Sequence, residues 1–344
     1  MHPGSQQTNH SARVAILGLG GTIAMKPAGG RGAVPGLTAE DLVAQLPESV
    51  VGHIRHVENF RQLPGAHIGL DDLVQLAARI RELEQSGEAN GFVVVQGTDT
   101  IEETVFALEL LCRGSAPVVV TGAMRHAGLV GPDGAANIAN SVVLAATPAA
   151  RERGAMVCFN DEIHAGWAVQ KTAATNLAAF SSPGFGPVGH VIEGRADLLL
   201  KAARWPAVAD EPAGIEPAPV ALVAAALGEG PELLDAVAQG HWRGLVVQAL
   251  GAGHLPASWV EPLERLARDM PVVLATRVSR GPVLTETYAF PGSEQDLIAR
   301  GLIPAGYLSA SKARILLSLA LGRGRGAKDV SALFRKGPPV RATC

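Results

Sequence analysis

Residues Val14–Ala24 read VAILGLGGTIA, an apolar run that stops at clustered glycines and is followed by a hydroxyl side chain. This order is typical of a buried parallel strand that opens into a loop at its carboxyl end. In open α/β sheets, ligands bind outside that edge of the sheet. Thr22, the hydroxyl residue, is therefore the first candidate for chemistry.

The same glycines have alternative explanations. Gly18, Gly20 and Gly21 are equally compatible with a tight first turn that has no chemical role. A dinucleotide fingerprint needs a third small residue at the start of a helix, but the sixth position counted from Gly18 is Ile23, and residues 26–30 read as a loop. The chain also contains no G-x-x-x-x-G-K phosphate loop and no G-x-S-x-G nucleophile elbow. Nucleotide binding and serine-hydrolase chemistry are therefore disfavoured.

Composition excludes several other classes. A length of 344 residues with 47% hydrophobic and 18% charged residues is typical of a globular protein with two domains. A net charge of −3, without a basic stripe, argues against binding to nucleic acid or anionic membranes. The three cysteines are far apart, and the only close histidine pair, His53 and His56, has no companion ligands, so no metal or other cofactor is expected. The polar start and the lack of a long apolar run predict a cytoplasmic protein.

Two more apolar strands end in polar residues in the way that the first one does. Residues 91–95 lead to QGTDT, which contains Thr98 and Asp99, and residues 117–120 lead to TGAMR, which contains Ala123. Amphipathic helical patterns follow each strand. The sequence therefore predicts an α/β fold, in which a larger N-terminal domain has a mainly parallel sheet flanked by helices.

A proline-rich stretch divides the chain. Residues 204–219 contain four prolines, which disfavour both helices and central strands. We expect a catalytic N-terminal domain at 12–203, a linker at 204–219 and a smaller C-terminal α/β domain at 220–344. Residues 26–36, with four glycines and two prolines, are expected to form a flap beside Thr22.

A threonine hydroxyl is a poor nucleophile until a partner accepts its proton. Thr98, Asp99 and Lys171 offer a second hydroxyl, a carboxylate and an amine whose pKa falls readily on burial. Each also has a structural explanation: Thr98 as a helix cap, Asp99 as a partner of the helix dipole and Lys171 as an exposed charge. Because the ends of parallel strands share one edge, we expect the three to converge near Thr22.

The segments GGTIA at 20–24 and GTDT at 97–100 resemble the two signature segments of the asparaginase/glutaminase family of amidohydrolases, the bacterial type. Five further matches follow in the family's order: TGAMR at 121–125, DG at 133–134 with Asn137, ND at 160–161, KT at 171–172 and KAR at 312–314. The resemblance extends over most of the chain. It implies the two-domain α/β fold of that family.

The resemblance also implies a two-step reaction. One threonine attacks an amide carbonyl, ammonia leaves, and water hydrolyses the acyl-enzyme ester. By position, Thr22 is the expected nucleophile, and Thr98, Asp99 and Lys171 form the second catalytic group. Asp99 is also expected to bind the α-ammonium of the substrate, and backbone N–H groups near Thr98 and Ala123 are expected to bind the oxyanion.

The chain departs from the family's pattern at three places, one of which is Ala252, where members have an asparagine. Well-studied members have a tyrosine on the flap that helps to activate the first threonine, whereas residues 26–36 contain none. Where members have a Ser-Gln pair that binds the substrate's α-carboxylate and α-amino groups, this chain has Gly65 and Ala66. Either backbone amides or His67 then bind the carboxylate, or the substrate is not a simple free amino-acid amide.

Members of the family complete each active site with residues of a neighbouring subunit. The matching loop here is GAGH at 251–254, and Glu286 is the approximate candidate for the contributed glutamate, with an exposed loop carboxylate as the alternative. The resemblance thus implies a homodimer or homotetramer. Its substrate is expected to be a small-molecule amide.

Three functional hypotheses follow. The leading one is hydrolysis of the side-chain amide of L-asparagine, with glutamine as a further candidate. The second is hydrolysis of a different amide, such as a D-amino-acid amide or a larger acyl-amide. The third is a non-catalytic relative that binds an amino acid.

Overall fold

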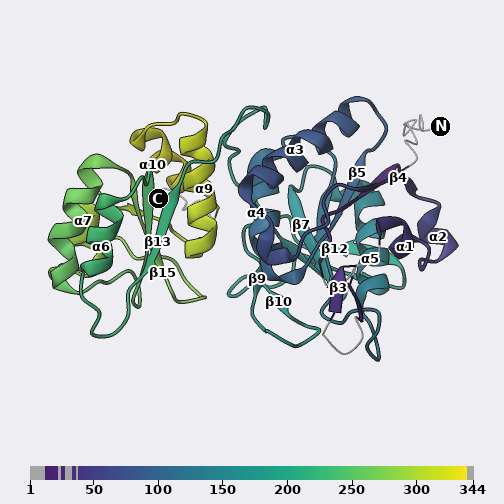
Figure 1. The fold of residues 1–344 in the computed structure, drawn as a ribbon, viewed down its shortest axis with the longest axis horizontal. Helices are drawn as coiled ribbons and strands as arrows, with labels where there is room; N and C mark the ends of the chain where they lie inside the picture. The colour runs from purple at the N-terminus through teal and green to yellow at the C-terminus, as the bar shows by residue number, and fades with distance from the viewer. Residues whose placement is uncertain (1–11, 22–24, 28–32, 36–37, 339–344) are drawn as a thin grey trace, which may run out of the picture.

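The computed structural model describes residues 12–21, 25–27, 33–35 and 38–338, and it consists of two α/β lobes joined by an extended segment (Figure 1). The N-terminal lobe contains the larger sheet and the C-terminal lobe the smaller one. This arrangement confirms the predicted fold class. The exact limits of the domains, with 204–219 as the linker, stay a prediction.

Among the described residues, the larger sheet has eight strands in the order β12-β11-β8-β7-β6-β5-β1-β4. The strands from β7 to β4 are parallel, and β8, β11 and β12 extend the sheet in antiparallel pairs. The bounds are β1 Val14–Gly18, β4 Ile54–Asn59, β5 Gly91–Val95, β6 Val118–Thr121, β7 Ala155–Phe159, β8 Glu162–Ala165, β11 Gly189–Ile192 and β12 Arg195–Leu198.

The strand order reverses between β1 and β5, which is the position where open α/β sheets bind ligands. From β1 the chain first pairs on one side, with β4, and then returns to the other side, with β5. Such a reversal opens a crevice at the carboxyl ends of the two strands. The register of β1, β5 and β6 aligns Gly18 with Val95 and Val95 with Thr121. The loops after these three strands therefore leave the sheet at the same level.

Helices cover both faces of the parallel strands, which explains why β1, β5, β6 and β7 are buried along their whole length. In Figure 1, α3 and α4 lie on the side of the sheet toward the C-terminal lobe, and α1, α2 and α5 lie on the other side. Thr38 forms a capping box with Asp41 at the start of α1. The bounds of the helices are α1 Ala39–Val43, α2 Glu48–Val51, α3 Leu70–Gln85, α4 Ile101–Leu111 and α5 Gly134–Ala146. Two short hairpins pair β2 Met25–Pro27 with β3 Ala33–Pro35 and β9 Gln170–Lys171 with β10 Phe180–Ser181.

The smaller sheet is parallel, in the order β13-β14-β15-β16. Helix α9 packs between this sheet and α4 of the other lobe, so apolar side chains of both lobes form one continuous core. The bounds are β13 Val220–Ala224, α6 Glu232–Gln239, β14 Gly244–Ala249, α7 Ala257–Asp269, β15 Val272–Thr276, α8 Glu294–Ala299, β16 Ile303–Pro304, α9 Ala310–Gly322 and α10 Ala327–Arg335.

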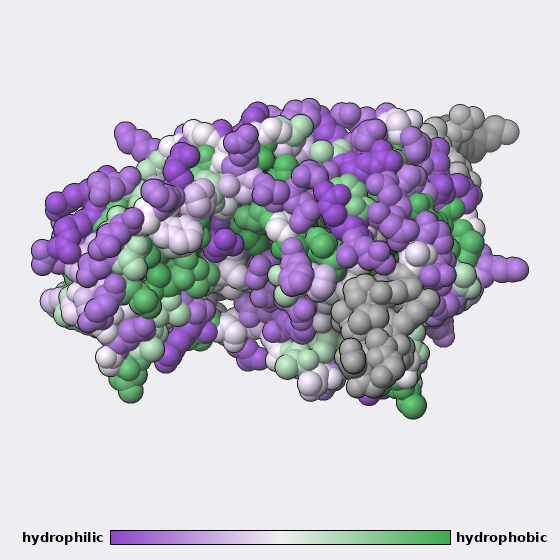
Figure 2. All heavy atoms as spheres, in the orientation of Figure 1, coloured by the Kyte–Doolittle hydropathy of each residue, from purple (hydrophilic) through white to green (hydrophobic). Residues whose placement is uncertain are grey.

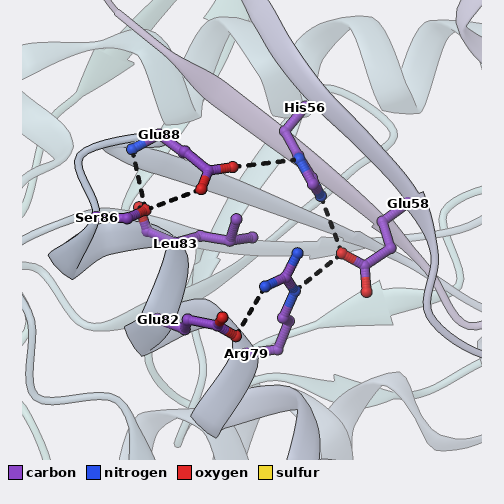
Figure 3. A network of polar contacts seen from close by, with 7 residues as sticks. All are labelled: His56, Glu58, Arg79, Glu82, Leu83, Ser86 and Glu88. Carbon is purple, nitrogen blue, oxygen red and sulfur yellow. Dashed lines mark hydrogen bonds and ion pairs between the residues drawn. The ribbon is translucent and has the colours of Figure 1, made fainter.

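Figure 3 shows the polar contacts that join the outer strand β4 to α3. Glu58 accepts hydrogen bonds from Arg79 Nε at 3.0 Å and lies 2.9 Å from His56 Nε2. Burial alone would raise the pKa of Glu58, but the contacts with His56 and Arg79 outweigh it and lower that pKa. Arg79 also pairs with Glu82 on its own helix. These contacts hold the edge strand on the side of β1 away from the crevice.

The buried carboxyl group of Glu109, on α4, ties the segment between the lobes to the N-terminal sheet. One oxygen accepts the N–H of Ala155 at 2.7 Å, and the other accepts the N–H of Trp205 at 3.0 Å. Burial raises the pKa of Glu109 to about 7, because Arg204 and the two N–H groups only partly offset the loss of hydration.

We expect the stability of the wild-type chain, relative to Glu109→Gln, to fall as the pH rises from about 4.5 to about 7. In this window the folded state, with its Glu109 pKa of about 7, binds a proton that the unfolded state, with a pKa near 4.5, has lost. The full difference is about 3 kcal/mol. Urea unfolding at pH 4 and pH 8 measures it, with the exposed Glu261→Gln as control. An equal stability gap at both pH values would contradict this account.

Candidate active site

The loops after β1 and β5 touch through their backbones. Gly21 has a φ of +89°, and a Cβ on it would lie 1.9 Å from the backbone nitrogen of Gly97. Gly20 has a φ of +99°, and its Cβ would lie 2.7 Å from the carbonyl oxygen of Leu63. Only glycine combines this conformation with such close approach. Gly21, the last described residue before position 22, therefore lies directly against the β5 loop. Thr22 itself lies outside the described residues.

Thr98 and Lys171 meet at the end of β5. Thr98 begins the short 3-10 helix Thr98–Thr100, and the residue is only 5% exposed. Lys171 Nζ donates a hydrogen bond to Thr98 Oγ1 at 2.9 Å. The same ammonium group lies 3.5 Å from Asp99 Oδ1, and the Asp99 side chain is 62% exposed. A buried hydroxyl is thus in contact with an amine that can exchange a proton with it, next to a carboxylate that is open to a ligand.

The segment that carries Lys171 is anchored on both sides. Lys171 pairs with Phe180 across the β9–β10 hairpin. Its backbone N–H donates to Glu102 Oε2 at 2.6 Å, and Glu102 belongs to the first turn of α4. Since α4 continues from the 3-10 helix that begins at Thr98, the same helical segment carries the buried hydroxyl and holds the backbone of the lysine.

Gly65 lies against the β5 loop. Its carbonyl oxygen accepts a hydrogen bond from Thr100 Oγ1 at 2.9 Å, and Gln96 Nε2 donates to that same hydroxyl at 3.1 Å. A Cβ on Gly65 would lie 3.4 Å from Asp99 Oδ2. Ala66 and His67 are exposed. The structure thus brings Gly65 next to Asp99, and it leaves Ala66 at the surface beside them.

Ala123 lies in a loop that packs on the β5 loop. A Cβ on the preceding residue, Gly122, would lie 2.4 Å from the carbonyl oxygen of Gln96. Asp133 accepts hydrogen bonds from the N–H groups of Met124 and Arg125, at 3.0 and 2.9 Å. Asn137 Nδ2 donates a hydrogen bond to the Gly122 carbonyl at 3.0 Å. Ala123 is therefore fixed at the same sheet edge as Thr98.

Glu286 belongs to the C-terminal lobe and is exposed. In the described part of the chain, no hydrogen bond or ion pair joins it to Thr98, Asp99 or Lys171. The loop that carries it is ordered by the buried Glu294, which accepts the N–H groups of Thr287 and Tyr288 at 2.9 and 2.7 Å. Burial opposes ionisation, but these hydrogen bonds outweigh it and lower the pKa of Glu294. A single chain thus presents Glu286 to the outside.

Sequence reasoning assigned no role to three residues that hold parts of the site: Glu102, Glu294 and Lys312. Glu102 was interpretable only as a partner of the helix dipole, because its bond to Lys171 joins positions 69 residues apart. Glu294 gave no signal. Lys312 gave one only as part of the KAR match at 312–314.

The described residues contain neither a metal-binding cluster nor a membrane-spanning helix. No group of three or more His, Cys, Asp or Glu side chains there can hold a metal ion. Within the same residues, no helix is both long and apolar enough to cross a membrane.

Known proteins match this chain in sequence and fold over both lobes. The family described as "Asparaginase, N-terminal" matches residues 13–204, and "Glutaminase/Asparaginase C-terminal domain" matches residues 219–334. A "Probable L-asparaginase" from Deinococcus radiodurans is 34% identical over 94% of this chain and 98% of its own length. A "Glutaminase-asparaginase" from Pseudomonas fluorescens is 30% identical over 94% of this chain and 90% of its own. The crystal structure of a "Probable Cytoplasmic L-asparaginase" from Campylobacter jejuni superimposes with a TM-score of 0.84 at 30% identity, covering 94% of this chain and 99% of that one.

Proposed function

The chain belongs to the asparaginase family, and on that premise we propose that it hydrolyses the side-chain amide of L-asparagine to the acid and ammonia, with glutamine as a second substrate. The activity is that of an asparaginase-type amidohydrolase. The observation that carries the residue assignment is the contact between the ammonium of Lys171 and the buried hydroxyl of Thr98, 2.9 Å apart.

Thr22 is the proposed nucleophile. Its oxygen forms a bond to the amide carbon, the carbon–nitrogen bond breaks, and the hydroxyl proton leaves with the nitrogen as ammonia. Water then attacks the ester, which releases the acid and restores the hydroxyl group. The close packing of Gly21 against the backbone of Gly97, the residue before Thr98, supports this role.

Thr98, Lys171 and Asp99 are the proposed second catalytic group. The Lys171 amine and the Thr98 hydroxyl relay the proton of the attacking water. Backbone N–H groups near Thr98 and Ala123 bind the oxyanion, a contribution of about 3 kcal/mol per donor in comparable sites. The exposed Asp99 binds the α-ammonium of the substrate. Gly65 and Ala66 are proposed to bind the α-carboxylate through their backbone amides, with the His67 side chain as the alternative.

Each site is proposed to be completed by the partner subunit's Glu286 in a homodimer or homotetramer. Supporting this, Glu286 is exposed on a loop that Glu294 orders, and the same loop exposes Tyr288 and Phe290 packed around His254. We also propose that the protein acts in the cytoplasm, the location named for the Campylobacter jejuni structure.

The test is ammonia release from L-asparagine, L-glutamine, D-asparagine and an acyl-amide by the wild type and by Thr22→Ala. We expect the variant to lose about 10³-fold or more in kcat, because the covalent step is lost. Thr22→Ser is the matched control, which keeps a hydroxyl group. Undiminished release by Thr22→Ala would refute the nucleophile assignment.

The same assay separates the remaining hypotheses. Selective hydrolysis of L-asparagine at low concentration would exclude a different amide as the main substrate, the alternative suggested by Gly65 and Ala66. An acyl group trapped on Thr22, detected by mass spectrometry after rapid acid quenching, would exclude a non-catalytic amino-acid-binding protein.

A further inference from the structure

Lys312 is a buried lysine whose ammonium group is hydrogen-bonded to backbone carbonyl groups of the other lobe. It belongs to α9 of the C-terminal lobe and is only 1% exposed. Its Nζ donates hydrogen bonds to the carbonyl oxygens of Gly166 at 2.9 Å and Trp167 at 3.1 Å, and also to that of Val169. An ammonium group has three N–H donors, and these three acceptors satisfy all of them.

The three carbonyls belong to a single turn that leads directly to Lys171. The N–H groups of Ala168 and Val169 both donate to the carbonyl of Ala165, the last residue of β8. Gln170 and Lys171 follow as β9. The charge of Lys312 therefore lies at the carbonyl end of the turn, where a cation is favoured, and two residues before the catalytic lysine.

Lys171 is thus held from two elements. Glu102 of α4 fixes its N–H, and Lys312 of α9 fixes the carbonyls just before it. Helices α4 and α9 are in direct contact and lie next to each other across the two lobes in Figure 1. Since Lys171 contacts Thr98 through a long side chain, a shift of the turn at 166–169 would move Nζ away from the hydroxyl.

A charge at this position is more than the fold alone requires. A buried ammonium loses its hydration, and an apolar side chain of similar size usually costs less. Burial lowers the pKa of Lys312 to about 8, a shift that Glu102 and Glu103 oppose, so the group remains mostly charged at neutral pH. The ring of Phe106, 5.9 Å from Nζ, is the other neighbour of the charge. The contribution of the charged group is that it holds three carbonyl groups in one fixed arrangement.

We propose that Lys312 is a positioning residue for the reaction, which sets Lys171 against Thr98 by binding the carbonyls of the turn at 166–169. This inference rests on the proposed function, in which Lys171 and Thr98 move the proton. It also assigns a role in catalysis to the contact between the lobes, because the C-terminal lobe orders a catalytic group of the N-terminal one.

The test is Lys312→Met, compared with Ser318→Ala. Methionine fills similar space and donates no hydrogen bonds. Ser318 is a buried residue of the same helix that donates to the carbonyl of Ala218, away from the 166–169 turn. We expect kcat for ammonia release to fall about 10- to 100-fold in Lys312→Met with KM within about threefold, because a small displacement of a catalytic group costs this much. Ser318→Ala should lower the melting temperature and leave kcat unchanged.

A double-mutant cycle distinguishes positioning from a general structural effect. If Lys312 acts through Lys171, adding Lys312→Met to Lys171→Met should lower kcat no further. Lys312→Gln, which keeps two N–H donors, should lie between the wild type and Lys312→Met. A folded Lys312→Met with wild-type kcat beside an inactive Lys171→Met would overturn this inference alone. Failure of both Lys312 variants to fold, while Ser318→Ala folds, would overturn it in favour of a purely structural role. An active Lys171→Met would instead refute the proposed function.

Discussion

Lys171→Met is expected to lower kcat for amide hydrolysis by about 10³-fold, within the usual range for loss of a general acid or base. The substitution removes the group that lies 2.9 Å from Thr98 Oγ1 and 3.5 Å from Asp99 Oδ1. The fold should persist, because the β9–β10 pairing and the bond to Glu102 hold Lys171 through its backbone. Steady-state ammonia release with circular dichroism as a folding check measures the effect.

Lys201→Met is the control, since Lys201 is an exposed lysine of the same lobe. It should keep wild-type kcat. Thr98→Val should match the loss in Lys171→Met, and the double variant should lose little more, because residues that act as one unit are not additive. Retention of most of the activity in Lys171→Met would show that the 2.9 Å contact serves structure alone.

The elements around the site were largely readable from the sequence because their signals are local. Apolar strands were predicted at 91–95 and 117–120, and the structure has Gly91–Val95 and Val118–Thr121. Polar residues after buried strands indicated which edge of the sheet carries Thr98 and Ala123, since parallel strands all point the same way.

Contacts between distant parts of the chain could not be predicted from the sequence. The bond from Lys312 to Gly166 spans 146 positions, and the bond from Trp205 to Glu109 spans 96. No periodicity encodes such pairs. Helix α10 was also missed, because the glycines and charges of residues 323–328 concealed the apolar face formed by Val330, Leu333 and Phe334. The predicted nucleophile, Thr22, lies outside the described residues and stays a prediction.

Gly21→Ala should abolish most of the activity although it adds a single methyl group. The Cβ would lie 1.9 Å from the nitrogen and 2.2 Å from the Cα of Gly97, and both are backbone atoms that cannot rotate away. Either the β1 loop or the β5 loop must then shift by an ångström or more. Such a displacement between the segment of Thr22 and that of Thr98 is expected to reduce kcat by about 10²-fold or more. Ammonia release by the purified, folded variant measures it.

The control separates this clash from ordinary glycine strain. Gly87 has a φ of +75°, and a Cβ there would meet nothing within 4 Å. Gly87→Ala thus carries the same left-handed penalty, about 1–2 kcal/mol of stability, without contact with the site. Equal losses of stability, with kcat reduced only in Gly21→Ala, would show that the two loops must touch for catalysis. Wild-type kcat in Gly21→Ala would mean that the reacting groups do not depend on this approach. In that case, the glycines of the VAILGLGGTIA stretch would serve only the turn.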